Sequence, residues 1–284
     1  MIRTLHTNLL TWLLLFLFPI ESSAATDFRL PAGLRSCGNG LVEKVLTGDR
    51  FILQTGTVVA LADIKAPEYW EPGAAYKSWP YGYHAKNVLS GLIIGKDVQL
   101  FCNKNRQNYL GQISAHVLLQ DQTWVQHHMV AAGAAYVFPL GRKVENASQL
   151  WAAEVIAREK RAGLWANDSL NAVHADGNNL RPGWFQLVHG TVLSSKAAKT
   201  SIYLNFGADW SEDFTIEIPN RVARRRNSDL PPLLEMAGLH VEVRGWVEWA
   251  GGPKIILENI TLLRILSEKP TAMNAPTDKT TPER

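Results

Sequence analysis

The chain has 284 residues, of which 46% are hydrophobic and 19% are charged, and its formal net charge is +3. This composition is ordinary for a globular protein and excludes disorder of the whole chain. The length exceeds that of one typical domain, so we expect two compact units with tails. The net charge is too small to demand an anionic partner, and such a partner would need a local cluster of basic residues.

The first 25 residues have the pattern of a secretory signal peptide. Arg3 supplies the positive charge, and residues 9–20 form an apolar run of 12 residues. Small residues at 22–24 then suit cleavage after Ala24 or Ala25. Because a membrane-spanning helix needs about 20 residues, we predict an exported protein, periplasmic or secreted, with no stable membrane span after cleavage. An uncleaved anchor is the alternative.

The exported portion contains two cysteines, Cys37 and Cys102. In an oxidising compartment they are predicted to form one disulfide. Closing so long a loop would stabilise the fold by about 4 kcal/mol in the chain-entropy account. Two buried free thiols are the alternative.

Between residues 40 and 166, strand patterns come first and helix patterns follow. We expect strands at 41–46, 51–53, 58–61, 98–102 and 113–119. Helical spacing of apolar residues predicts helices at 83–94, 124–135 and 147–163. Three strands, a helix, two strands and terminal helices are the order of a five-stranded OB-type barrel with added helices. The predicted fold class is therefore β-rich α+β.

The remainder of the chain divides into a linker, a second unit and a tail. Residues 167–183 are polar and contain Gly177 and Pro182, which is typical of a linker. Residues 184–267 hold strand-like segments and one short helix in an order that predicts a second small OB-like β-barrel. Residues 268–284 are rich in Pro, Thr and Lys and predict a disordered tail.

Residues 61–68 read L-A-D-I-K-A-P-E, after the turn Thr47-Gly48-Asp49 and before the helix that Pro80-Tyr81-Gly82 opens. This order resembles the staphylococcal-nuclease-like (thermonuclease) family, whose matching segment usually reads R-L-x-G-I-D-A-P-E. The resemblance covers roughly residues 40–166. The resemblance implies the barrel expected above, and it implies that the nuclease site of the family corresponds to the turn at 47–49 and the segment 61–68.

The resemblance implies a general-base glutamate, two phosphate-holding arginines and two aspartates that help to bind calcium. By position, Glu68 matches the base and Asp49 matches one metal aspartate. The arginine positions are occupied by Ala60 and Gln112, and the second metal aspartate is replaced by Lys65. Hydrolysis of a phosphodiester requires an activated water and neutralisation of charge on the phosphate. These three replacements therefore favour loss of efficient calcium-dependent catalysis.

Other residues near this segment offer further hypotheses. The Lys65 ammonium could take the place of the metal, pairing with Glu68 or with a phosphate. Arg50 and Arg106 could line the site and supply the missing guanidinium groups. Alternatively, Asp49, Lys65 and Glu68 are only solvated loop charges.

Two features outside the segment bear on ligand binding. Residues 136–138 fall where the family carries aromatic side chains near the nucleotide base, so they predict either base stacking or core packing. The densest basic run lies in the second unit, beside aromatics such as Trp246 and Trp249, and it predicts a nucleic-acid surface or a solvated loop. Its members are Arg221, Arg224, Arg225 and Arg226.

The sequence therefore predicts an exported, thermonuclease-like protein that is catalytically degenerate. Its expected partner is nucleic acid, for example a single strand, or else an envelope protein. No cofactor is expected in that case. The alternative is a divergent phosphodiesterase that hydrolyses DNA or RNA with Glu68 as general base and with calcium. A third hypothesis is a structural adaptor whose two barrels present protein-binding surfaces.

Overall fold

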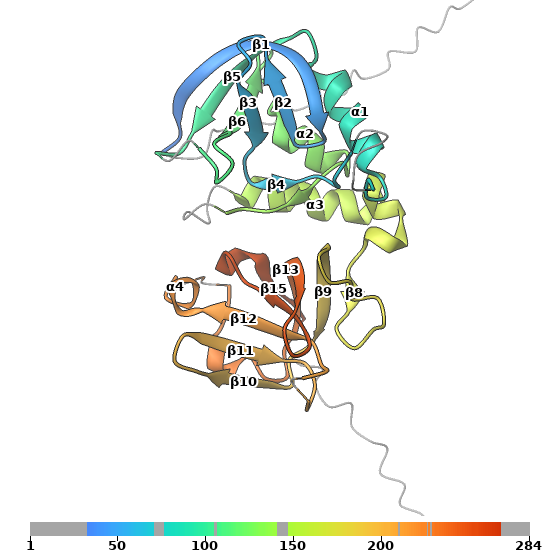
Figure 1. Cartoon of the computed structure of the whole chain (residues 1–284), viewed down its shortest axis with the longest axis vertical. Helices are drawn as coiled ribbons and strands as arrows, with labels where there is room; N and C mark the ends of the chain where they lie inside the picture. Colours follow the sequence, from blue (N-terminus) through green and yellow to red (C-terminus); the bar gives the residue numbers. More distant parts are fainter. Residues whose placement is uncertain are drawn as a thin grey trace, which may run out of the picture.

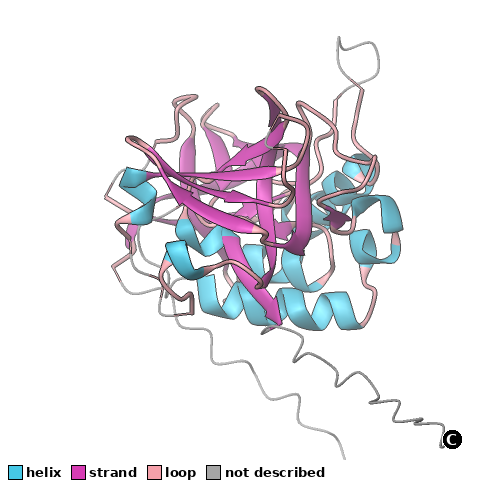
Figure 2. Ribbon diagram, turned by 90° about the horizontal axis from the view of Figure 1, so that it is seen from below, coloured by secondary structure: helices cyan, strands magenta, loops and turns pink. Residues whose placement is uncertain are grey.

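The structure is a computed structural model that describes residues 33–70, 77–104, 107–140, 147–209, 211–225, 227 and 229–267. The predicted signal peptide, the predicted tail, Arg106 and Arg226 lie outside the described residues. Two β-rich bodies lie one above the other along the long axis (Figure 1). Viewed along that axis, strands fill the middle of the projection and helices lie towards its edges (Figure 2).

The first body begins with strands and ends with helices, as the sequence predicts. Its strands are β1 (Arg35–Thr47), β2 (Arg50–Leu53), β3 (Val58–Leu61), β4 (Ile64–Lys65), β5 (Asp97–Cys102), β6 (Ile113–Leu119) and β7 (Tyr136–Val137). Its helices are α1 (Gly82–Ile93), α2 (Val125–Ala131) and α3 (Ser148–Glu159), followed by the short 3-10 helices η2 (Gly163–Ala166) and η3 (Asp168–Leu170).

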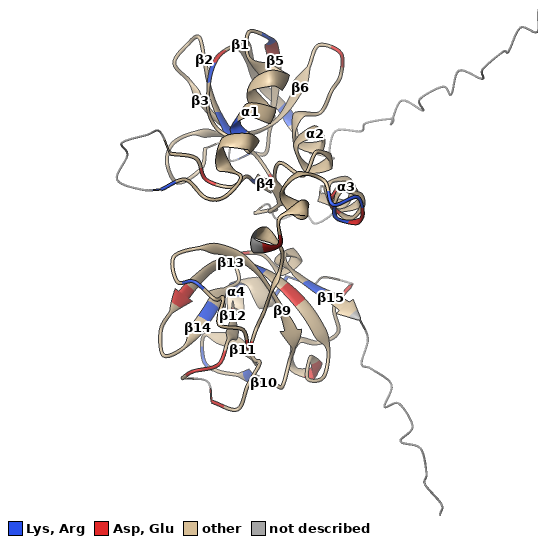
Figure 3. Ribbon diagram, turned by 90° about the vertical axis from the view of Figure 1, so that its right-hand side faces the viewer, with Lys and Arg blue, Asp and Glu red and all other residues tan. Residues whose placement is uncertain are grey.

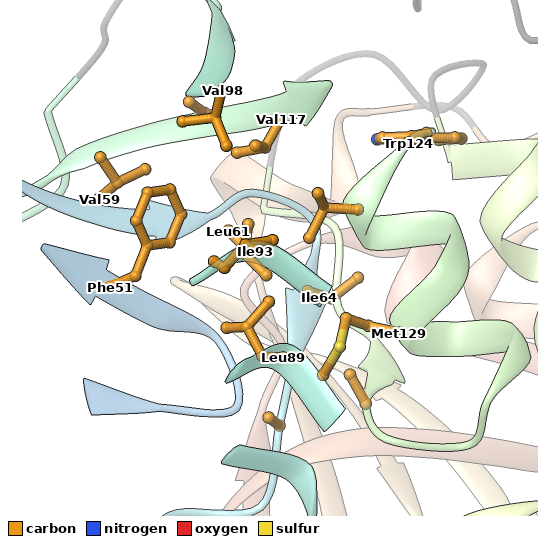
Figure 4. Close-up of a cluster of buried hydrophobic side chains, with 14 of the residues drawn as sticks. Phe51, Val59, Leu61, Ile64, Leu89, Ile93, Val98, Val117, Trp124 and Met129 are labelled. Carbon is orange, nitrogen blue, oxygen red and sulfur yellow. The ribbon is translucent and has the colours of Figure 1, made fainter. Parts of the chain in front are cut away.

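Five of these strands close a barrel in the order β1-β2-β3-β6-β5. β3 and β6 run parallel, and the other neighbours are antiparallel. Alternate residues of β2 and β3 are buried, because one face of each strand lines the barrel interior. Phe51, Val59 and Val117 are buried there, and Leu89 of α1 belongs to the same hydrophobic cluster (Figure 4). The predicted five-stranded barrel with helices is confirmed.

The second body holds eight strands, more than the five of the predicted barrel. They are β8 (Val173–His174), β9 (Phe185–Thr191), β10 (Ser194–Ala197), β11 (Ser201–Asn205), β12 (Thr215–Pro219), β13 (His240–Trp249), β14 (Pro253–Ile256) and β15 (Leu263–Ser267). The helices are α4 (Asn220–Ala223) and the short 3-10 helices η4 (Leu233–Glu235) and η5 (Ile260–Leu262).

The second sheet repeats the strand order of the first barrel. Its order is β10-β11-β12-β14-β13-β9-β8, with β12 and β14 parallel. β10 follows β9 directly along the chain, although the two strands lie apart in this order, and β15 pairs with β13 outside it. The predicted β-rich second module is therefore present, with extra strands at its margin.

The segment 167–183 is not a free linker. β8 lies inside it and pairs in parallel with β9, through Val173 opposite Val188 and His174 opposite His189. Ala175 is buried beside them. Gly177 lies in the turn after this short strand and Pro182 in the turn before β9. The polar composition of the segment therefore concealed its place in the sheet.

A disulfide crosslinks two strands of the first barrel. Cys37 and Cys102 are joined in a disulfide between β1 and β5, with their Cα atoms 5.8 Å apart. Within the described residues, every helix is too short or too polar to span a bilayer.

Candidate functional site

The fold brings together Asp49, Lys65 and Glu68, three of the residues that the sequence singles out. Asp49 lies in a tight turn, in which a Cβ atom on Gly48 would lie 2.7 Å from the Cβ atoms of both Ala66 and Ala85. Helix α1 begins against Glu68, because a Cβ atom on Gly82 would lie 2.2 Å from the Glu68 carbonyl oxygen. Glycine at both positions lets the turn at Gly48, the segment 66–68 and helix α1 pack closely.

These residues and Arg50 form a cluster of alternating charges, which we call the charge cluster. The Lys65 ammonium donates to Glu68 Oε1 and lies 3.7 Å from Asp49 Oδ2. The Arg50 guanidinium holds both oxygens of Glu68, with Nη2 3.3 Å from Oε1 and Nη1 3.5 Å from Oε2. Arg50 Nε also lies 3.8 Å from Asp49 Oδ1. Two cations and two carboxylates therefore neutralise one another.

The charge cluster is largely removed from solvent. Asp49, Lys65 and Glu68 are only 5%, 7% and 8% exposed, whereas the Arg50 side chain is 25% exposed. Burial alone would raise the pKa of Asp49. Lys65 and Arg50, helped by hydrogen bonds from the Thr47 hydroxyl and the Ala66 amide, instead hold that pKa below its ordinary value. Asp49 is thus ionised at neutral pH.

The pKa of Arg50 moves in the opposite direction. Burial would lower it, but the Asp49 and Glu68 carboxylates and, to the least extent, Tyr109 raise it above its ordinary value. Arg50 is therefore charged. Arg50 and Lys65, the two cations of the charge cluster, are both paired with the carboxylates that a calcium ion would need as ligands.

The donor set does not fit a calcium ion. Calcium takes six to eight oxygen ligands, whereas Asp49 and Glu68 are the two carboxylates here and the Lys65 ammonium contacts both. Elsewhere in the described residues, no group of three or more His, Cys, Asp or Glu side chains is arranged to hold a metal. The Lys65 ammonium therefore occupies the place among these carboxylates that a calcium ion would need.

The two positions that lack arginine have different surroundings. Ala60 lies directly opposite Arg50 across the β2–β3 pair, so the Arg50 guanidinium reaches the cluster from the neighbouring strand. Gln112 is half-buried in the β5–β6 loop, where its Oε1 atom accepts a hydrogen bond of 3.0 Å from Asn108 Nδ2. Arg50 thus lines the site as predicted, whereas Arg106 lies outside the described residues.

The second body covers the charge cluster, which the sequence did not reveal. The Lys65 ammonium lies 5.5 Å from the ring centre of Trp79 and 5.7 Å from that of Trp246 on β13. Trp79 also stacks on Trp184 at 6.0 Å and meets Trp246 edge-on at 5.5 Å. A cation between aromatic faces is attracted to both rings. Trp246 therefore packs against Lys65, rather than standing free beside the basic run.

Residues 136–138 also pack against the second body. Tyr136 and Phe138 are buried and contact Phe185 of β9, with ring centres 5.8 and 5.0 Å apart. The Tyr136 hydroxyl donates to the Leu170 carbonyl at 2.9 Å. Of the two alternatives for this segment, the structure therefore shows core packing.

A second set of charges joins α3 to β13, and we call it the interface network. Arg244 is fully buried and donates to Glu154 Oε2 at 2.8 Å, to Glu242 Oε1 at 2.7 Å and to the Val137 carbonyl at 2.8 Å. Arg158 donates to both carboxylates at 2.8–2.9 Å. Helix α3 carries basic and acidic residues at this boundary between the bodies (Figure 3). The interface network fixes the second body over the charge cluster.

The interface network predicts sensitivity to acid. Burial would raise the pKa of Glu242, but Arg244 and Arg158 lower it from its ordinary value of 4.5 to about 2. A carboxylate with a lowered folded-state pKa contributes stability above its unfolded pKa, and that contribution is lost as the pH falls towards 2. We expect a loss on the order of 3 kcal/mol across this window.

Urea unfolding at a series of pH values between about 6 and 2.5 would measure this loss. The Glu242→Gln variant should lose less stability across the same window, because it has no carboxylate to protonate. Parallel profiles for the two proteins would contradict the assignment.

The basic run lies on and after α4, away from the charge cluster. Arg221 and Arg224 are exposed and Arg225 is half-buried. Arg221 faces Glu258, whose pKa is raised by burial and lowered by Arg221, with burial prevailing. The described part of the run therefore offers exposed cations, with an acidic neighbour for one of them.

A known protein family matches the part of the first body that begins at residue 58. The model of the family described as staphylococcal nuclease homologue matches residues 58–167. With the closed barrel, this match defines a staphylococcal-nuclease-like domain. None of the curated proteins compared with the chain matches it.

Proposed function

We propose that this chain is an exported protein that uses a catalytically degenerate nuclease-like domain to bind nucleic acid without hydrolysing it. The observation that carries the proposal is the Lys65 ammonium, which is bound to Glu68 and lies close to Asp49. A general base must be free to take a proton from water. Both oxygens of Glu68 are instead engaged by Arg50 and Lys65.

Exposed side chains support nucleic acid as the ligand. Arg50 is the most exposed member of the charge cluster, and Tyr109, in the loop between β5 and β6, is 94% exposed. Arg221 and Arg224 are exposed on the second body. Guanidinium groups that contact phosphates, with aromatic rings that stack on bases, are the means by which proteins hold single strands.

The test has one arm for hydrolysis and one for binding. In a plasmid-nicking assay with calcium or with chelator, we expect no cleavage that depends on Glu68, so the protein and its Glu68→Gln variant should behave alike. Calorimetric titration with calcium should show no micromolar binding. Calcium binding at Asp49, or nicking that the variant loses, would refute the degenerate site.

In the binding arm, a gel shift with single-stranded DNA should weaken as salt rises. Binding releases counterions from the DNA phosphates, and this gain becomes smaller at higher salt concentration. Charge reversal at Arg221 and Arg224 should weaken the shift if the basic run takes part. The absence of a shift at low salt would remove nucleic acid and leave an envelope protein as the partner.

The alternative, a divergent phosphodiesterase, rests on Arg50. Its guanidinium reaches Glu68 from the strand opposite Ala60, where the family has an arginine. In that case a bound phosphate would have to displace Glu68 from Arg50. Cleavage that is lost in both Glu68→Gln and Arg50→Ala would establish this alternative.

A further inference from the structure

The second body carries a groove that lies outside the charge cluster. It has a volume of about 510 Å³ and lies on the outer face of β10, β11, β12 and β14. The inward neighbours on three of these strands, Leu204, Ile216 and Ile255, are fully buried in the core. Loops 207–208 and 250–253 form part of its wall. Pockets that bind small ligands commonly have volumes in this range.

The floor of the groove is an ordered array of polar side chains. Asn205 lies opposite Ser194 and Thr215 on the flanking strands. Its amide donates to Ser194 Oγ at 3.2 Å, and its carbonyl accepts from Thr215 Oγ1 at 3.3 Å. In the neighbouring row, Tyr203 lies between Lys196 and Glu217. These contacts hold one aromatic ring among donors and acceptors of fixed position.

The charges around the groove cancel. Lys254 donates to Glu217 Oε2 at 2.9 Å and lies opposite Glu248 on β13. Lys196 and Lys254 are the two cations that line the groove and Glu217 is the carboxylate, so Glu248 beside them brings the charge to zero. A polyanion gains its affinity from phosphates neutralised by unpaired cations, so this surface favours a ligand without net charge.

We propose that this groove binds a short, neutral oligosaccharide. The flat face of Tyr203 suits the C–H face of a sugar ring, and the side chains of Asn205, Thr215 and Lys196 can exchange hydrogen bonds with its hydroxyl groups. Barrels with this strand order bind oligosaccharides as well as oligonucleotides, and the cancelled charge decides between the two. This site is independent of the nucleic-acid binding proposed above.

Calorimetric titration of the purified protein with chitotriose, cellotriose and maltotriose tests the proposal. We expect at least one of them to bind, with an affinity that changes less than about twofold between roughly 50 and 300 mM salt. Tyr203→Ala should weaken binding by about tenfold or more, the effect of losing an aromatic contact of roughly 1.4 kcal/mol. Asn205→Ala should weaken it as well. Tyr83→Ala, an exposed tyrosine on α1 of the first body, is the matched control and should leave the affinity unchanged.

Three results would overturn the proposal. The first is that none of the three sugars binds to protein whose circular dichroism and thermal unfolding are normal. The second is sugar binding that survives both Tyr203→Ala and Asn205→Ala. The third is salt-dependent binding of single-stranded DNA that Lys196→Ala abolishes, which would assign the groove to nucleic acid.

Discussion

Replacing Arg244 with methionine is expected to destabilise the protein by about 3–5 kcal/mol, because it leaves buried carboxylates without their cation. Glu154 and Glu242, 0% and 2% exposed, both bind Arg244. The remaining cation, Arg158, is partly exposed and must then serve both carboxylates. For a protein of this size, the change corresponds to a fall in melting temperature of about 6–20 °C. Thermal and urea unfolding measure it.

Two variants make this prediction specific. Arg221→Met removes an exposed arginine of the same body and should change stability by less than about 0.5 kcal/mol. The double variant Arg244→Met, Glu242→Met leaves Glu154 paired with Arg158, so it should be more stable than Arg244→Met alone. If the single and double variants were equally destabilised, Arg244 would act through packing rather than through charge.

The first barrel could be predicted from the sequence because its signals are local. Alternation of buried residues in β2 and β3 and the helical spacing of α1 appear within a few residues, and their order along the chain specifies the barrel. The proximity of Asp49 to Lys65 and Glu68 follows from the same order. The turn that holds Asp49 precedes β2, the segment that holds Lys65 and Glu68 follows β3, and these two strands are antiparallel neighbours. Periodicity and resemblance therefore agree for this part of the chain.

The interface between the two bodies could not be predicted in the same way. Arg244 lies in a strand whose sequence suggests alternating polar positions, yet it is buried against Glu154, which is 90 residues earlier in the chain. In the sequence, Trp246 looks like an aromatic residue that could bind a ligand, but in the structure it packs over Lys65. Such roles depend on how separate bodies dock, and no local pattern encodes docking. Similarly, β8 is too short for its alternation to be recognised within a polar segment.

The docking of the second body gives a physical reason for a lysine at position 65, where the nuclease-like family usually has an aspartate. A lysine at this position supplies a cation that is tethered to the chain and always present, and Trp79 and Trp246 can stabilise it. The site thereby becomes part of the structural core between the bodies. If so, restoring the carboxylate should make stability depend on an added cation.

The Lys65→Asp variant is expected to be destabilised by about 3–5 kcal/mol in the presence of chelator, because three carboxylates would then share a buried site with Arg50 alone. Calcium should restore part of this stability, by about 2.7 kcal/mol at a concentration 100 times the dissociation constant. The unaltered protein should show no change in melting temperature with calcium, because its own ammonium lies among the carboxylates. Thermal unfolding with calcium and with chelator measures both effects.

Lys65→Met is the matched control for Lys65→Asp. It removes the ammonium without adding an oxygen ligand, so it should be destabilised and should gain less from calcium than the aspartate variant does. A calcium response in the unaltered protein would show that Lys65 does not exclude the cation. Equal responses in the two variants would show that Asp49 and Glu68 alone hold calcium, and that the lysine acts only by blocking them. A response confined to Lys65→Asp would identify this single exchange as the change that converts a cation site into a buried ion-pair cluster.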